Sequence, residues 1–197
     1  MIYAKTPVLS DQAATLWQVC HWRAEAQRDE IAFTYLGDEG EPDQHLTYGE
    51  LDDRARRIAA GLQQRGLVDE PVVLKFPTGL EYITAILGCM YAGAIAVPAY
   101  PIELMRARRT LARIEVMLQS CRAKAVLANA ESMGLLRGVL GQNLSCVQLL
   151  SWNEAIDAPI DAWTPGDASL SKIALLQYTS GSTAHPRGVM EIGRAHV

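Results

Sequence analysis

The sequence predicts an α/β fold in which a largely parallel sheet is flanked by helices. Two observations indicate this class. From Pro71 to Gln177, short apolar runs of strand length alternate with longer segments of helical pattern. The 197 residues are 49% hydrophobic and 20% charged, which is typical of a folded globular domain. Strands that alternate with helices pair in parallel and are covered by helices on both faces.

The first part of the chain is predicted to form two helices and a strand. We expect a helix over 13–28, a strand over 31–36, an acidic hairpin or loop over 37–43, and a helix over 47–66. Thr47 and Glu50 have capping-box spacing, in which each side chain satisfies a backbone donor of the other. Gly66 suits a left-handed helix end. The arginine-rich face of this second helix is expected to lie in solvent.

The second part of the chain carries the regular alternation. We expect strands over 72–76, 94–97, 125–128, 147–150 and 173–177, and helices over 80–92, 104–120 and 131–140. In sheets of this kind, ligands bind beyond the carboxyl ends of the strands. The segments that follow the strands are therefore the places to search for a site.

Composition and motif searches exclude several classes of function. The formal net charge of −4 argues against a nucleic-acid partner. The four cysteines have neither CxxC nor zinc spacing, so we expect reduced thiols, no metal site and a cytoplasmic protein. No signal peptide is recognisable. The apolar stretch 82–100 contains Gly88, Gly93 and Pro98 and is interpreted as a buried helix and strand, so no membrane span is expected.

A hydroxyl-rich loop (179–183) follows the last predicted strand. Its sequence is Thr-Ser-Gly-Ser-Thr, and Arg187 lies shortly after it. The glycine lets backbone donors approach an anion, and a guanidinium suits phosphate oxygens. The chain has no GxxxxGK[ST] or GxGxxG motif, which excludes a Walker loop and leaves a Rossmann site unsupported. On composition alone, a surface loop without a ligand explains the pattern equally well.

The order of residues favours the phosphate interpretation. The segment LLQYTSGSTAHPRGVM resembles the phosphate-loop motif of the adenylate-forming superfamily, approximately YTSGSTGxPKGV. This superfamily contains acyl-CoA synthetases, nonribosomal adenylation domains and luciferases. Two positions depart from the motif: Ala184 replaces a glycine, which restricts the loop, and Arg187 replaces a lysine, which keeps the charge.

A second segment narrows the resemblance to the fatty acyl-AMP ligases. The run PTGLEYITAILGCMYAGAIAVPAYP is similar to a region of those enzymes, approximately PPGLDFIAAFFGCLYAGVIAVPAYP. The early element LTYGEL at 46–51 and Gln177 before the tyrosine also fit this subgroup. Ile102 departs from the pattern, because a second proline is usual there. We assign no ligand to residues 88–101, because any helix packed on a sheet would give the same pattern. We interpret them as scaffold that identifies the family.

The resemblance implies a function and a set of cofactor-binding residues. It implies ATP and Mg²⁺ as cofactors, a fatty acid as substrate, and the phosphopantetheine thiol of an acyl carrier protein as acceptor, in lipid, polyketide or lipopeptide biosynthesis. By this resemblance, the cofactor-binding residues are Thr179, Ser180, Gly181, Ser182, Thr183, Arg187 and Gly188. Open alternatives are an acyl-CoA synthetase, a nonribosomal adenylation domain and a catalytically inactive fragment.

The resemblance also implies which parts of the enzyme this chain contains. Residues 1–190 are expected to be the N-terminal portion of the adenylation (AMP-binding) domain. Residues 191–197 resemble nothing in the family and look like a translated sequencing adapter. In such enzymes, the catalytic lysine and the magnesium-binding acid lie after the region that this chain resembles. No catalytic or metal-binding residue is therefore assigned, and the 197 residues alone are expected to be inactive.

Overall fold

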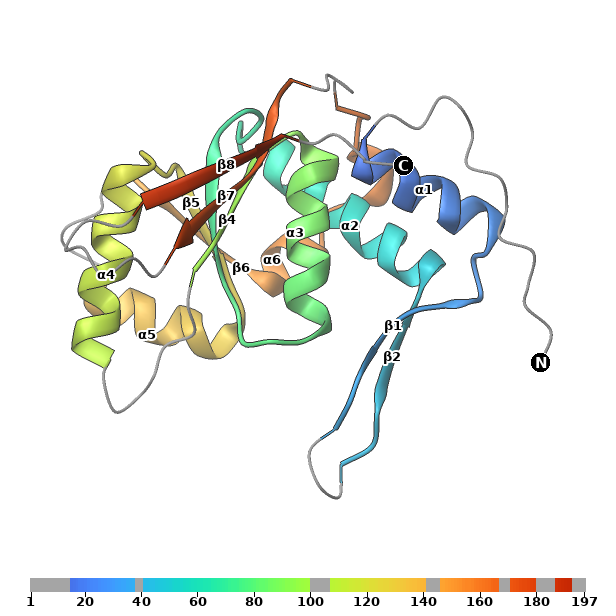
Figure 1. Cartoon of the computed structure of the whole chain (residues 1–197), viewed down its shortest axis with the longest axis horizontal. Helices are drawn as coiled ribbons and strands as arrows, with labels where there is room; N and C mark the ends of the chain where they lie inside the picture. The colour runs from blue at the N-terminus through green and yellow to red at the C-terminus, as the bar shows by residue number, and fades with distance from the viewer. Residues whose placement is uncertain are drawn as a thin grey trace.

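The computed structural model describes residues 15–37, 41–99, 107–140, 146–166, 171–179 and 187–192. Within these ranges, side chains are not described for 107–111, 138–140, 179 and 187. The described chain contains a six-stranded sheet with helices on both faces and a separate two-stranded hairpin (Figure 1).

The six-stranded sheet has the strand order β6-β5-β3-β4-β7-β8. Its strands are β3 (Pro71–Lys75), β4 (Ile95–Pro98), β5 (Ala125–Ala128), β6 (Gln148–Ser151), β7 (Ile173–Thr179) and β8 (Arg187–Ile192). All neighbouring pairs are parallel except β7 and β8, which form an antiparallel pair. The predicted largely parallel sheet is confirmed. Strand β8 was not predicted, and its last two residues belong to the segment 191–197.

The predicted helices are present, with small shifts at some ends, and the predicted positions 13–14 and 104–106 lie outside the described residues. The helices are α1 (Leu16–Ala26), α2 (Tyr48–Gln63), α3 (Leu80–Ala92), α4 (Ala107–Ser120), α5 (Ala130–Leu140), α6 (Trp152–Ile156) and the 3-10 turn η2 (Ile160–Ala162). The capping box of α2 is confirmed, because Thr47 Oγ1 accepts from the Glu50 N–H and the Glu50 carboxylate accepts from the Thr47 N–H. Helix α6 and η2 were not among the predicted elements.

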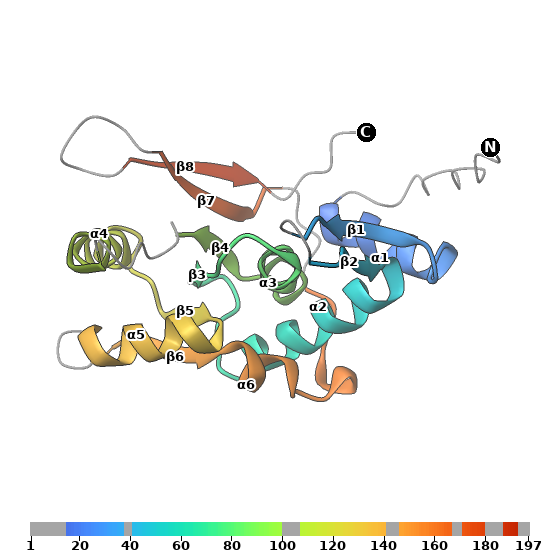
Figure 2. The ribbon, with the colours of Figure 1, turned by 90° about the horizontal axis from the view of Figure 1, so that it is seen from below.

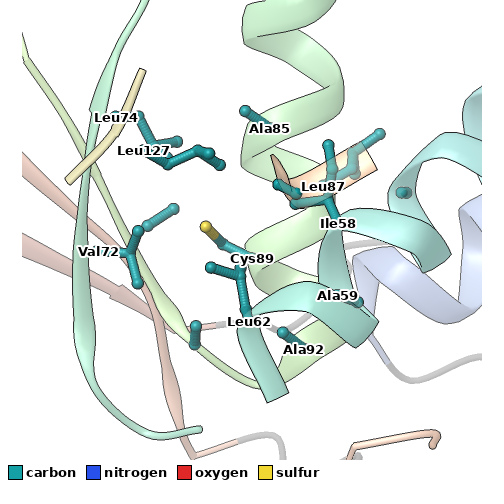
Figure 3. Close-up of a cluster of buried hydrophobic side chains, with 14 of the residues drawn as sticks. Ile58, Ala59, Leu62, Val72, Leu74, Ala85, Leu87, Cys89, Ala92 and Leu127 are labelled. Atoms are coloured by element: carbon teal, nitrogen blue, oxygen red, sulfur yellow. The ribbon is translucent and has the colours of Figure 1, made fainter. Parts of the chain in front are cut away.

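The sheet separates two hydrophobic clusters. Val72 and Leu74 of β3 belong to the cluster with α2 and α3, whereas Val73 belongs to the cluster with α4 and α5. Successive side chains of a strand point to opposite faces, so a strand buried on both sides carries apolar residues throughout. Figure 2 shows the two helical layers on either side of the strands, and Figure 3 shows the first cluster around Cys89.

Helices α2 and α3 approach each other closely at Gly88. A Cβ atom placed on Gly88 would lie 2.7 Å from Ile58 Cβ and closer still to Ile58 Cγ2. Only glycine fits there without displacing one helix. Gly93 ends α3 in the left-handed region with a φ of 74°, and the chain then enters β4.

The β1–β2 hairpin extends away from the sheet (Figure 1). Strand β1 (Ile31–Tyr35) pairs antiparallel with β2 (Gln44–Thr47), which leads directly into α2. Leu46 of β2 is fully buried in the cluster with α2 and α3, whereas Phe33 and Tyr35 of β1 remain partly exposed. The expected strand and hairpin are confirmed.

Candidate functional site

The candidate site lies at the carboxyl end of β7. In this sheet β3, β4, β5, β6 and β7 run parallel, so their carboxyl ends share one edge. Strand β7 ends at Thr179 and β8 begins at Arg187, and these two residues are register partners. The antiparallel pair therefore brings both ends of the predicted loop together at the edge where ligands bind in such sheets.

The structure describes only part of the predicted phosphate-binding set. Ser180, Gly181, Ser182 and Thr183 lie outside the described residues, and only the backbones of Thr179 and Arg187 are described. The geometry of the hydroxyl-rich loop thus stays a prediction. What the structure adds is the position of its two ends and of the residues next to them.

Tyr178 anchors the strand immediately before the loop. Its side chain is buried, and its hydroxyl donates a hydrogen bond of 2.9 Å to Ser120 Oγ at the last residue of α4. Burial raises the pKa of the Tyr178 phenol, so the hydroxyl stays protonated at neutral pH and is available as a donor.

Gly188 packs against Tyr178 from the neighbouring strand. A Cβ atom on Gly188 would lie 2.9 Å from Leu176 Cδ1 and 3.4 Å from Tyr178 Cζ. The absence of a side chain therefore lets β8 lie close to these two residues. Its assignment as a cofactor-binding residue stays a prediction, since this packing explains the glycine without a ligand.

Lys75 is a buried cation at the same edge, and sequence reasoning missed it. It is the last residue of β3, it pairs with Ala128 of β5, and it is 1% exposed. Burial lowers the pKa of its ammonium group to about 8. The available signal was a single lysine at the end of the apolar run Val-Val-Leu, at a position where a parallel sheet buries every side chain.

A second polar cluster surrounds the buried carboxylate of Asp52. Tyr91 Oη donates to Asp52 Oδ1 at 2.8 Å, and Arg56 Nε donates to Oδ2 at 2.8 Å. His21 Nδ1 lies 2.8 Å from Asp52 Oδ1. The expectation that the arginine-rich face of α2 lies in solvent is wrong for Arg56, because its side chain, like that of His21, reaches this carboxylate. Tyr91 precedes β4, so the cluster lies near the amino ends of the strands, away from the loop.

The described residues contain no group of three His, Cys, Asp or Glu side chains that could hold a metal ion. The four cysteines are thiols and form no disulfide. Burial raises the pKa of Cys20 to about 11 and that of Cys89 to about 12, so both stay protonated at neutral pH. Among the helices that the structure describes, none is long and apolar enough to cross a membrane.

A family match and two of the most similar relatives agree with each other. The family described as "AMP-binding enzyme" matches residues 20–191. The chain is 34% identical over 180 residues to the medium-chain-fatty-acid–[acyl-carrier-protein] ligase JamA of Moorena producens, covering 90% of this chain and 30% of that protein. It is 30% identical over 186 residues to the long-chain-fatty-acid–AMP ligase FadD32 of Mycolicibacterium smegmatis, covering 91% and 29%.

Solved structures agree with these relatives. The fold resembles a fatty acid AMP ligase from Legionella pneumophila with a TM-score of 0.79 and 32% identity, covering 92% of this chain and 31% of that one. A fatty acyl-adenylate ligase from L. pneumophila in complex with acyl adenylate and pyrophosphate matches with a TM-score of 0.78 and 32% identity, over the same shares of the two chains. The chain spans about 30% of the length of these relatives.

Proposed function

The chain belongs to the AMP-binding enzyme family, and from that premise we propose that it is the N-terminal part of a ligase that activates a fatty acid with ATP. One observation carries the proposal. The family's motif residues begin where β7 ends, and the β7–β8 pair brings Thr179 and Arg187 together at the carboxyl edge of the sheet. The named fatty acid ligases among the relatives support a fatty acid as the substrate.

In the proposed reaction, a carboxylate oxygen of the fatty acid attacks the α-phosphorus of ATP, and pyrophosphate leaves. The products are the acyl adenylate and pyrophosphate. The hydroxyl-rich loop would hold the β- and γ-phosphates through backbone N–H groups and hydroxyls, and Arg187 would add a fixed positive charge. These groups stabilise negative charge as it shifts towards the leaving pyrophosphate.

Mg²⁺ is proposed as the counter-ion of the triphosphate. The part of the chain that the structure describes offers no cluster of metal-binding side chains, so no step is assigned to metal ligands of this chain. The two anion-binding elements that we assign are the hydroxyl-rich loop and Arg187.

We propose an acyl carrier protein as the acceptor and the cytoplasm as the location. The name of the M. producens relative, an acyl-carrier-protein ligase, supports this acceptor. The acyl adenylate would then supply lipid, polyketide or lipopeptide biosynthesis. An acyl-CoA synthetase is the main alternative. Offering the complete protein coenzyme A or a phosphopantetheinylated carrier separates the two, because our proposal predicts a thioester only with the carrier.

The 197 residues alone are proposed to be catalytically inactive. They span about 30% of the length of related ligases, so about two thirds of such an enzyme has no counterpart in them. We also propose that residues 191–197 are foreign to the family. Reading the source gene beyond the codon for Met190 tests this, and a verified gene that encodes Glu191–Val197 followed by a stop codon would contradict it.

Trapping of the acyl adenylate with hydroxylamine tests the proposed activity in the full-length protein. We expect acyl hydroxamate that depends on both ATP and a fatty acid. Arg187→Gln should reduce its rate by about ten-fold or more, whereas Arg113→Gln, a change of an exposed arginine on α4, should not. Hydroxamate formation from amino acids but not from fatty acids would refute the proposed substrate class.

A further inference from the structure

Tyr178 lies next to both strand ends that border the hydroxyl-rich loop. It directly precedes Thr179 in β7, and its register partner Gly188 directly follows Arg187 in β8. Its ring lies next to the space where a Gly188 side chain would be. Tyr178 therefore lies next to both ends of the loop, beside Thr179 along the chain and beside Arg187 through its register partner Gly188.

The described backbone pairing between β7 and β4 lies away from the end of β7 that leads into the loop. The described register between β4 and β7 contains the pair Ala96–Leu175, three residues before Tyr178. Beyond that pair, the register partners of β7 within the described residues lie on β8, which is itself an edge strand. A side-chain contact at the loop-bearing end of the β7–β8 pair therefore adds to its attachment to the rest of the domain.

The Tyr178 side chain supplies such an attachment. Its hydroxyl reaches Ser120 Oγ at 2.9 Å, across 58 positions of sequence, and it also interacts with the neighbouring Cys121 thiol. Ser120 is the last residue of α4, a helix that packs on the sheet through Ile114, Met117 and Leu118. The bond thus connects the start of the loop to a helix that is itself fixed on the sheet.

We propose that Tyr178 is a positioning residue for triphosphate binding, because its hydrogen bond to Ser120 holds Thr179 and Arg187, the two residues at which β7 ends and β8 begins, in place. The identity of the ligand, ATP, rests on the proposed function, whereas the hydrogen bond between Tyr178 and Ser120 does not. We assign no contact between Tyr178 and substrate. The side chain acts through the loop, so it affects how well ATP binds and not which fatty acid is chosen.

The test uses three variants of the full-length protein: Tyr178→Phe, Ser120→Ala and the double variant. Ser120→Ala removes the acceptor of the hydrogen bond, and Tyr178→Phe removes its donor together with the interaction of that hydroxyl with the Cys121 thiol. We expect each to raise the KM for ATP by about five-fold, with the KM for the fatty acid unchanged. The double variant should be no worse than Tyr178→Phe alone, because Ser120→Ala then has no hydrogen bond left to remove. Tyr35→Phe, on the distant hairpin, is the matched control.

Hydrogen exchange of the peptide 174–192 gives a readout that does not need activity. In Tyr178→Phe and Ser120→Ala, its amides should exchange about five-fold faster than in the wild type, with peptides of α2 and α3 unchanged. Unchanged exchange, or effects of the two single changes that add in the double variant, would overturn the inference. If the wild type forms no acyl hydroxamate, the proposed function fails, and hydrogen exchange still decides the anchoring role.

Discussion

Replacing Gly88 with alanine tests the packing of α2 against α3. The new Cβ would lie 2.7 Å from Ile58 Cβ, whereas carbon atoms in contact prefer about 3.5–4.0 Å. The helices must therefore separate by about 1 Å at a contact inside the main hydrophobic cluster. Overpacking of this kind costs about 1–3 kcal/mol, and the better helix propensity of alanine returns at most about 1 kcal/mol. We expect Gly88→Ala to lower the free energy of unfolding by about 1–2 kcal/mol.

The assay is urea unfolding of the chain, followed by circular dichroism at low protein concentration, with Gly134→Ala as the matched control. Gly134 lies in α5, where an added Cβ meets nothing within 4 Å. This control should be neutral or stabilising by up to about 1 kcal/mol. Combining Gly88→Ala with Ile58→Ala should cost less than the sum of the two single changes. A Gly88→Ala variant as stable as Gly134→Ala would refute the close contact.

Three further predictions follow from the structure. Lys75 binds its proton less tightly in the folded chain, with a pKa lowered from 10.5 to about 8, so its charge destabilises the fold fully below pH 8 and ceases to do so as the pH rises towards 10.5. Lys75→Met should thus raise the free energy of unfolding by at most about 3 kcal/mol at pH 7, and this increase should become smaller between pH 8 and 10.5. An increase that stays constant with pH in urea unfolding contradicts this. Asp52→Ala should cost about 1–3 kcal/mol, because it leaves the buried Tyr91 hydroxyl without its acceptor, whereas Arg56 keeps its ion pair with Asp53, and a loss below about 0.5 kcal/mol in the same assay would count against the network. The 197-residue chain should form no acyl hydroxamate and should associate, since edge strand β8 exposes Val189, Met190 and Ile192; a monomer by light scattering that melts reversibly contradicts the second part.

Local patterns in the sequence predicted most of the fold. The apolar runs that became β3, β4 and β5 are buried on both faces, so their composition alone marks them as parallel strands. The capping box at Thr47 and Glu50 fixed the start of α2 correctly. These signals act over a few residues, which is why a single sequence reveals them.

The features that were missed depend on contacts between distant parts of the chain. The run Arg-Gly-Val-Met-Glu-Ile has no strand pattern of its own and becomes β8 by pairing with β7. The contact of His21 with Asp52 joins positions 31 residues apart and forms because α1 packs beside α2, so no local pattern indicates it. For the candidate site, the motif predicts the residues, whereas the structure shows the position of the loop ends and the hydrogen bond between Tyr178 and Ser120.

The central claim is that the complete protein adenylates fatty acids, and fatty-acid-dependent exchange of labelled pyrophosphate into ATP tests it most directly. Exchange requires only binding of both substrates and reversible formation of the acyl adenylate, so it needs no knowledge of the acceptor. We predict exchange with fatty acids and none when the fatty acid is omitted or replaced by an amino acid. A full-length protein that is folded and binds ATP, yet shows no exchange with fatty acids of any chain length, would contradict the account.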